Sequence, residues 1–269
     1  MKRALSELIF ADCLFIIFLS LSGVFDGAVG NVFYILTFTL PLTLILFLGK
    51  SEEAEPCKIS LLASKKSLIT TSLFIFPTVF LMILFAFLTS LLMKSSGSFV
   101  EAETLEGNLF LLILTRAFSP AVFEEMLFRY VPIKLLKNHS PRLTVIYSSI
   151  LFSFAHCNLF QIPYAFVAGL IFALLDVSAG SILPSVVIHF ANNVFSVIWQ
   201  RNGENSRFVL IFLLLISFLA LASAVIIYLR RKRLKKEFSE VFEDKSKLIF
   251  TYPLIMYMAV TLFAAVSAF

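Results

Sequence analysis

Long apolar runs are the feature that most restricts the fold of this chain, because a segment that crosses a bilayer must satisfy its backbone hydrogen bonds internally. A helix needs about 20 apolar residues to span ~30 Å of hydrocarbon. We therefore predict an all-α fold, a polytopic transmembrane helix bundle of eight to nine spans, in a single integral membrane domain over residues 1–269. The nine runs are Leu8 to Val24, Val32 to Leu48, Leu68 to Met93, Asn108 to Leu135, Leu143 to Phe160, Ile162 to Leu175, Leu183 to Trp199, Phe208 to Tyr228 and Leu248 to Phe269.

The sixth run is shorter than a bilayer requires. Ile162 to Leu175 also contains Pro163 and Gly169, both of which weaken a helix interior. A re-entrant or strongly buried helix is therefore an alternative to a full crossing for this segment.

The composition excludes several classes of protein. It is 59% hydrophobic and 14% charged, whereas soluble domains are about 25% charged. The net charge of +5 would suit a nucleic-acid partner, but the basic residues lie between apolar runs, so we expect the lipid bilayer as a partner and no nucleic acid. Cys13, Cys57 and Cys157 are scattered and predict neither a disulfide framework nor a metal site.

Basic residues gather in alternate loops, as they do in cytoplasmic loops of membrane proteins. The opposite loops hold acidic residues instead, and Arg201 and Arg207 depart from the rule. We predict a multi-pass protein of the cell (plasma) membrane with a cytoplasmic N-terminus and an external C-terminus. The basic positions on the cytoplasmic side are Lys2, Arg3, Lys50, Lys58, Lys65, Lys66, Lys134, Lys137, Arg142 and the run from Arg230 to Lys236.

The run from Arg230 to Lys236 is followed by the acidic residues Glu237, Glu240, Glu243 and Asp244. This pattern predicts a surface helix in the headgroup region. A topology anchor is the favoured interpretation, and recruitment of an acidic substrate or lipid is the alternative.

Charged and polar residues interrupt three of the apolar runs. A charge at the centre of a bilayer costs about 2.5–3.5 kcal/mol, so such residues are candidates for function. Glu125 and Arg129 are four residues apart and can pair along a helix, while Glu124 is rotated by ~100° from Glu125. His189 and Asn193 also share a helix face.

Taken singly, each of these residues is more often a packing contact between helices than a catalyst. Together with His156, however, they form the set needed to activate water and hold an oxyanion. Arg116 and Asp176 lie near the edges of their runs and are interpreted as snorkelling or capping groups.

The residue order separates the candidate chemistries. A zinc site could use His156, His189 and a carboxylate, but no His-Glu-x-x-His motif is present. No glycine-rich elbow presents a serine nucleophile, and Cys157 would point ~100° away from His156 on a helix. Water activated by a buried glutamate with help from histidine is the mechanism that remains.

Three motifs in order resemble a known family. Glu124-Glu125-x-x-x-Arg129, Phe152-x-x-x-His156 and His189-x-x-x-Asn193 are similar to the motifs of the CAAX protease and bacteriocin-processing (CPBP) membrane proteins, which include the Ras-converting CAAX endopeptidase. The resemblance covers about Ala117 to Val197, so we expect the catalytic core at 117–197. Tyr130 stands where many relatives have glycine and is expected to narrow the site.

The resemblance implies an intramembrane glutamic endopeptidase that needs no metal and no other cofactor. By analogy, Glu124 and His156 would activate the water, His189 and Asn193 would stabilise the tetrahedral oxyanion, and Glu125 and Arg129 would support them. The expected partner is a membrane-associated peptide or protein substrate, prenylated or of leader type, cut near its C-terminus in a buried polar cavity reached from the cytoplasmic side. The alternatives are a catalytically silent bacteriocin-immunity or scaffold protein, and a transporter that uses Glu124 as a proton carrier.

Overall fold

The computed structural model describes residues 1–25, 27–48, 59–60, 62–96, 105–202 and 205–267. Regular structure in these segments is helical, apart from one isolated bridge between Ser60 and Ser181, which confirms the predicted all-α class. The helices are α1 (Lys2–Val24), α2 (Gly27–Leu48), α3 (Lys65–Ser96), α4 (Leu109–Ile113), α5 (Ser119–Glu125), α6 (Val131–Leu136), α7 (Pro141–Ala155), α8 (Ile162–Ala179), α9 (Leu183–Asn202), α10 (Ser206–Leu229), α11 (Arg231–Glu237), α12 (Ser239–Phe242) and α13 (Tyr252–Ser267).

Among the residues that the structure describes, four helices are long and apolar enough to cross a bilayer by themselves, which makes the chain a multi-pass membrane protein. They cover Lys2–Ser22, Lys65–Leu92, Ile162–Ala179 and Arg207–Leu229. The apolar run from Ile162 to Leu175 is by itself too short for a crossing, but the helix that it forms, α8, continues four residues further to Ala179. Gly180 then ends α8 in the left-handed conformation, with φ of 62°, which glycine adopts without steric cost.

The helices α4, α5 and α6 form one helical rod from Leu109 to Leu136, with two π-helical turns at Leu114–Phe118 and Met126–Tyr130. Each π turn is followed by a proline, Pro120 or Pro132. Proline has no N–H and its ring clashes with the carbonyl four residues earlier, so the turn before it widens. The second widened turn lies directly after Glu125 and contains Arg129.

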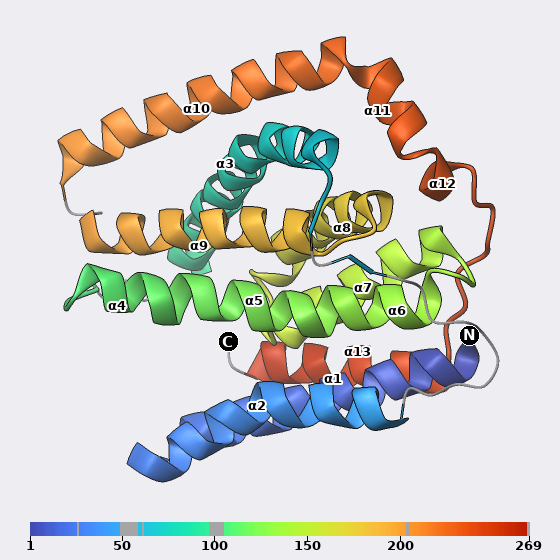
Figure 1. Cartoon of the computed structure of the whole chain (residues 1–269). Coiled ribbons are helices and arrows are strands. Elements are labelled where there is room, and N and C mark those ends of the chain that lie inside the picture. The colour runs from blue at the N-terminus through green and yellow to red at the C-terminus, as the bar shows by residue number, and fades with distance from the viewer. Residues whose placement is uncertain (26, 49–58, 61, 97–104, 203–204, 268–269) are drawn as a thin grey trace.

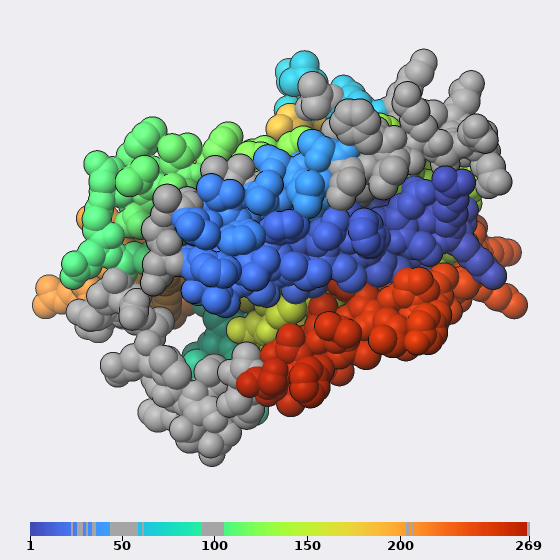
Figure 2. All heavy atoms as spheres, turned by 90° about the horizontal axis from the view of Figure 1, so that it is seen from below, coloured from blue at the N-terminus to red at the C-terminus, as the bar shows by residue number. Residues whose placement is uncertain are grey.

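The rod runs through the middle of the bundle. Helix α9 packs along one side of it and α1, α2 and α13 lie on the other (Figure 1). The α7–α8 hairpin packs against the rod and α9, while α3 and α10 pack on each other outside α9. Seen from below, α1, α2 and α13 form one continuous face of the molecule (Figure 2). The rod and α9 are therefore covered on several sides by other helices.

Helix α7 is shorter than the apolar run that predicted it. It ends at Ala155, and the residues up to Phe160 form a turn, so the expectation of one helix through to Phe160 was wrong. The side-chain oxygen of Asn158 accepts hydrogen bonds from the backbone N–H groups of Phe160 and Gln161 at 3.0 and 3.2 Å. Such local bonds compete with helix formation, and they start the next helix at Ile162 instead.

The basic run does form a separate helix, α11, but this helix is not simply laid on the surface. Its basic side chains are exposed, whereas Leu234 and the C-cap residue Phe238 are buried against Phe172, Leu175 and Ile188 of the bundle. The helix is amphipathic, and its apolar side closes one end of the bundle.

Candidate active site

Glu125 and Arg129 form the ion pair that their spacing predicted. The Nε atom of Arg129 lies 3.3 Å from Oε2 of Glu125, and both side chains are fully buried. A buried charge without a partner is very unfavourable, so each of these side chains depends on the other. The pair ties the end of α5 to the π turn that follows it.

Two phenyl rings enclose this guanidinium. The Cζ atom of Arg129 lies 4.4 Å from the ring centre of Phe152 on α7 and 5.7 Å from that of Phe172 on α8. A cation over an aromatic face is attracted by the quadrupole of the ring. Phe152 also contacts both candidate histidines, with its ring centre 4.9 Å from that of His156 and 5.8 Å from that of His189. Phe152 is therefore the common packing surface of the site, a role that the sequence did not indicate.

His189 on α9 is oriented by Glu125 and faces Glu124. Its Nδ1 lies 2.7 Å from Oε1 of Glu125. An ionised carboxylate only accepts hydrogen bonds, so Nδ1 carries a proton and Nε2 is left for chemistry. Nε2 lies 3.9 Å from Oε2 of Glu124. That distance is too long for a direct hydrogen bond, but one water molecule can bridge two polar atoms at such a separation.

The two neighbouring glutamates have different surroundings. The Glu125 side chain is fully buried, and its Oε1 accepts a hydrogen bond from His189 while its Oε2 forms the ion pair with Arg129. The Glu124 side chain keeps 20% of its surface accessible. The two carboxylates thus separate into one that holds the site together and one that can reach a bound molecule.

His156 is the C-cap residue of α7, directly after Ala155. Its Nδ1 lies 2.8 Å from the carbonyl oxygen of Phe152, one helical turn back. A carbonyl can only accept, so Nδ1 donates and Nε2 is the unsubstituted nitrogen. The Phe152 carbonyl therefore fixes His156, whereas it is His189 that lies opposite Glu124.

Asn193 lies one turn beyond His189 on α9 and lines a neighbouring cavity of about 290 Å³. Pro120 and Arg116, on the rod about one and two turns before Glu124, line the same cavity. The cavity extends toward Leu105 and Gln200, away from the Lys134 end of the rod, so access from the Lys134 end stays a prediction. Its remaining lining residues are Thr115, Ser196 and Val197.

Two further contacts hold the site elements in place and were not evident from the sequence. Pro132 has no N–H for the carbonyl of Phe128, and this carbonyl instead accepts from the hydroxyl of Ser148 on α7 and from Nη1 of Arg129. The loosened rod is thereby bonded to α7. Asp176 has the capping role expected of it, since its Oδ1 accepts from the backbone N–H of Ser185 at 3.0 Å in the first turn of α9.

No group of three or more His, Cys, Asp or Glu side chains within the described ranges is arranged to hold a metal ion. In each of the two histidines Nδ1 is already engaged, in His189 by Glu125 and in His156 by the Phe152 carbonyl. Three converging protein ligands, as catalytic zinc requires, are not assembled by these residues.

Comparison with known proteins finds a match over the segment that contains the candidate residues. Residues 106–195 match the family described as Rce1-like, Type II CAAX prenyl endopeptidase Rce1-like. The match covers about a third of the 269 residues and includes all six candidate positions from Glu124 to Asn193. It confirms the resemblance to the CAAX protease family over this segment. The chain has no match among the curated proteins or the solved structures.

Proposed function

We propose that this member of the CAAX protease family is an intramembrane glutamic endopeptidase, in which Glu124 activates a water molecule to hydrolyse a peptide bond. The observation that carries the proposal is the approach of Oε2 of Glu124 to Nε2 of His189, at 3.9 Å, with the other side of the imidazole held by Glu125. A water molecule can lie within hydrogen-bonding distance, about 2.8 Å, of both atoms at once.

The reaction then needs only proton transfers by side chains of the chain. Glu124 takes a proton from the water as its oxygen attacks the scissile carbonyl carbon. The tetrahedral intermediate collapses, the C–N bond breaks, and the proton passes from Glu124 to the leaving nitrogen. The products are a new carboxyl group and a free amine.

The two histidines and Asn193 complete the proposed machinery. His189 has Nδ1 fixed by Glu125, so Nε2 is held at a constant position relative to Glu124, and it can donate to the oxyanion when both ring nitrogens carry protons. Asn193, one turn further along α9, offers an amide N–H to the same oxyanion. His156 presents its unsubstituted Nε2 and is proposed to orient the water with Glu124.

The proposed substrate is a membrane-associated peptide or protein, cut near its C-terminus. Prenylated and leader-type peptides are the two classes to test. The cavity of about 290 Å³ that contains Asn193 and Arg116 offers polar side chains next to the reacting groups, which suits an extended peptide backbone. We further propose that the helices form eight to nine spans around a polar cavity, in the plasma membrane with the N-terminus in the cytoplasm, in accord with the loop charges.

The test is cleavage of fluorescence-quenched peptides by the purified protein. A farnesylated peptide and bacterial leader peptides are offered to the wild type, to Glu124→Ala and to His189→Ala. The control is Glu240→Ala, which removes a carboxylate that is 53% exposed in α12. We expect cleavage by the wild type and the control, losses of at least about 100-fold in the two site variants, and no inhibition by chelators. Absence of cleavage in the wild type with every peptide would favour an immunity or scaffold role.

A further inference from the structure

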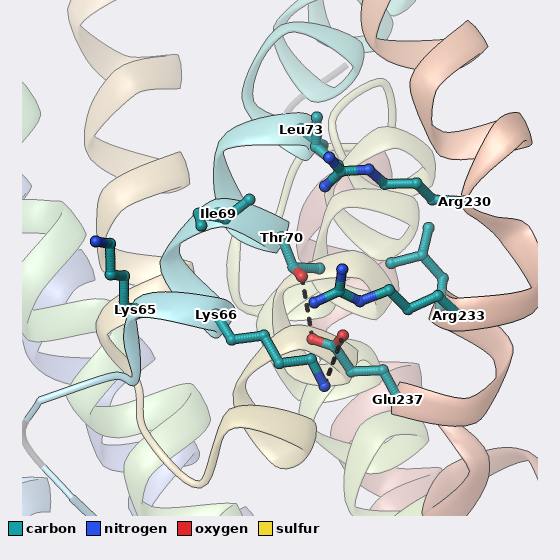
Figure 3. A pocket seen from close by; sticks show the side chains of 9 residues that line it. Lys65, Lys66, Ile69, Thr70, Leu73, Arg230, Arg233 and Glu237 are labelled. Atoms are coloured by element: carbon teal, nitrogen blue, oxygen red, sulfur yellow. Dashed lines mark hydrogen bonds and ion pairs between the residues drawn. The ribbon is translucent and has the colours of Figure 1, made fainter.

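A cationic pocket lies at one end of the bundle, away from the candidate active site. It has a volume of about 300 Å³ and is formed between the first turns of α3 and the junction of α10 with α11. Figure 3 shows Arg230 and Arg233 extending from this junction toward α3. The other lining residues are Lys65, Lys66, Ile69, Thr70, Leu73, Leu234 and Glu237.

The charges in this pocket do not balance. Four lining residues are basic and one, Glu237, is acidic, which leaves a formal charge of +3. Glu237 is already engaged, because Lys66 lies 3.3 Å from its Oε2 and the hydroxyl of Thr70 lies 3.1 Å from its Oε1. Lys65, Arg230 and Arg233 make no side-chain hydrogen bond or ion pair with any residue that the structure describes. A concentration of unpaired positive charge of this kind favours a bound anion.

The position of the pocket indicates which anion. Helix α3 begins at Lys65 and α10 ends at Leu229, and both are apolar enough to cross a bilayer. The two helices pack on each other, so the pocket lies where two membrane spans reach the headgroup layer together. The surfaces that lead away from it are apolar, since Ile69 on α3 is 48% exposed and Val225 on α10 is 50% exposed. These surfaces suit acyl chains, whereas a free anion in water would gain nothing from them.

We propose that this pocket binds the phosphate of an anionic phospholipid, whose acyl chains lie along the exposed faces of α3 and α10. Arginine is well suited to this role because its planar guanidinium donates two parallel hydrogen bonds to a phosphate. Basic pockets between membrane helices recognise anionic headgroups by this chemistry.

Side-chain packing would also connect a lipid bound in this pocket to the candidate active site. Leu234 of α11 and Phe238, the residue directly after this helix, lie in the same buried cluster as Phe172 and Ile188. Phe172 contacts both His189 and Arg129, and Ile188 precedes His189 in α9. A lipid that fixes α11 therefore stabilises the cluster on which the site is built, so lipid binding is expected to raise the unfolding temperature of the whole bundle.

The experiment uses the full chain in neutral detergent micelles. Dioleoyl phosphatidylglycerol is titrated in, and retained lipid is measured by native mass spectrometry together with the midpoint of thermal unfolding. Dioleoyl phosphatidylcholine tests the need for net charge, and inorganic phosphate tests whether a free anion suffices. We expect phosphatidylglycerol to be retained and to raise the midpoint, and the other two probes to do neither.

Two variants remove pocket charges from opposite walls. Arg230→Gln/Arg233→Gln should weaken phosphatidylglycerol binding by about 25- to 30-fold, and Lys65→Gln by about fivefold, since each basic side chain contributes about fivefold near an anionic headgroup. The matched control is Lys232→Gln/Lys235→Gln, which removes the same charge from exposed positions of α11 outside the pocket. We expect it to bind as the wild type does.

Three results would each overturn the proposal. Equal losses in the pocket and control variants would show diffuse attraction to a basic surface. Equal binding of phosphatidylcholine would show that charge is not recognised. Equal protection by inorganic phosphate would show a free-anion site without a role for the acyl chains. None of these results depends on proteolysis, so they leave the proposed function untouched.

Discussion

The substitution Arg129→Met should be the most destabilising single change in the site that leaves the shape of the bundle intact. It removes one half of an ion pair whose members are both fully buried and 3.3 Å apart. Loss of one partner from such a pair costs about 3–5 kcal/mol, because the remaining charge has no compensation. The substitution also removes the contact between the Arg129 guanidinium and the Phe152 ring, whose centre lies 4.4 Å from Cζ. We therefore expect the free energy of unfolding to fall by about 3–5 kcal/mol.

The double variant Glu125→Gln/Arg129→Met separates charge from packing. Both buried charges are gone, and the amide oxygen of glutamine can still accept from Nδ1 of His189. Replacement of a buried ion pair by neutral groups of similar volume is often neutral for stability. We therefore expect the double variant to recover most of the stability that Arg129→Met loses.

The assay is reversible unfolding of the two single variants and the double variant in mixed micelles, analysed as a double-mutant cycle. The pair Arg3 and Glu7 on α1 is the control, because it has the same four-residue spacing and a distance of 3.0 Å but an arginine that is 79% exposed. Its coupling energy should be below about 1 kcal/mol. Additive losses at Glu125 and Arg129, or a loss below about 1 kcal/mol for Arg129→Met, would refute the reasoning.

Two further predictions concern contacts that hold the site elements together. Ser148→Ala removes the hydroxyl that donates to the Phe128 carbonyl and should lower the free energy of unfolding by about 1–3 kcal/mol. The control Ser72→Ala, at an exposed position of α3, should change the free energy of unfolding by less than about 0.5 kcal/mol. Equal effects of the two variants in the same unfolding assay would contradict this prediction. The second prediction concerns the pKa of Asp244. Partial burial raises this pKa, but hydrogen bonds from Ser140 and two backbone amides outweigh burial and hold the pKa of Asp244 below its ordinary range. The unfolded chain then binds more protons, so the stabilisation is complete above the unfolded pKa of about 3.9 and is lost as pH falls toward the folded value. The unfolding midpoints of wild type and Asp244→Asn should therefore differ by a constant amount at pH 6 and above, and the difference should shrink progressively as pH falls below ~4. A difference that does not depend on pH would contradict the prediction.

The helices themselves were predictable because their signal is long and simple. Each apolar run in the described chain became a helix, and the i, i+4 spacing placed Arg129 on Glu125 correctly. The end of α7 was not predictable from hydropathy, because Phe160 is apolar although Asn158 has already ended the helical hydrogen bonding. Pro120 and Pro132 could have signalled the widened turns, but only the structure shows which partner receives the carbonyl that proline leaves unpaired.

The candidate site was predictable in its members and less so in its pairings. Placing a charged or polar residue inside an apolar run costs free energy in a bilayer, so Glu124, Glu125 and His189 can be recognised as candidates from the sequence. Which nitrogen meets which carboxylate depends on how α9 crosses the rod, and a single sequence does not contain that information. In the structure Nδ1 of His189 is hydrogen-bonded to Glu125, and Nδ1 of His156 is hydrogen-bonded to the Phe152 carbonyl. Phe152 was noted only as part of a motif, since an apolar ring among 32 phenylalanines carries no signal of its own.

The most direct test of a catalytic Glu124 is the rate at which Glu124→Gln cleaves a peptide that the wild type cleaves. Glutamine keeps the size of the side chain but cannot take a proton from water, so the fold and the contacts of Glu125 with His189 should persist. With unfolding midpoints of the two proteins matched, we predict a loss of at least about 100-fold in the single-turnover rate. A Glu124→Gln protein that cleaves within about tenfold of the wild-type rate would contradict the assignment of this carboxylate as the general base.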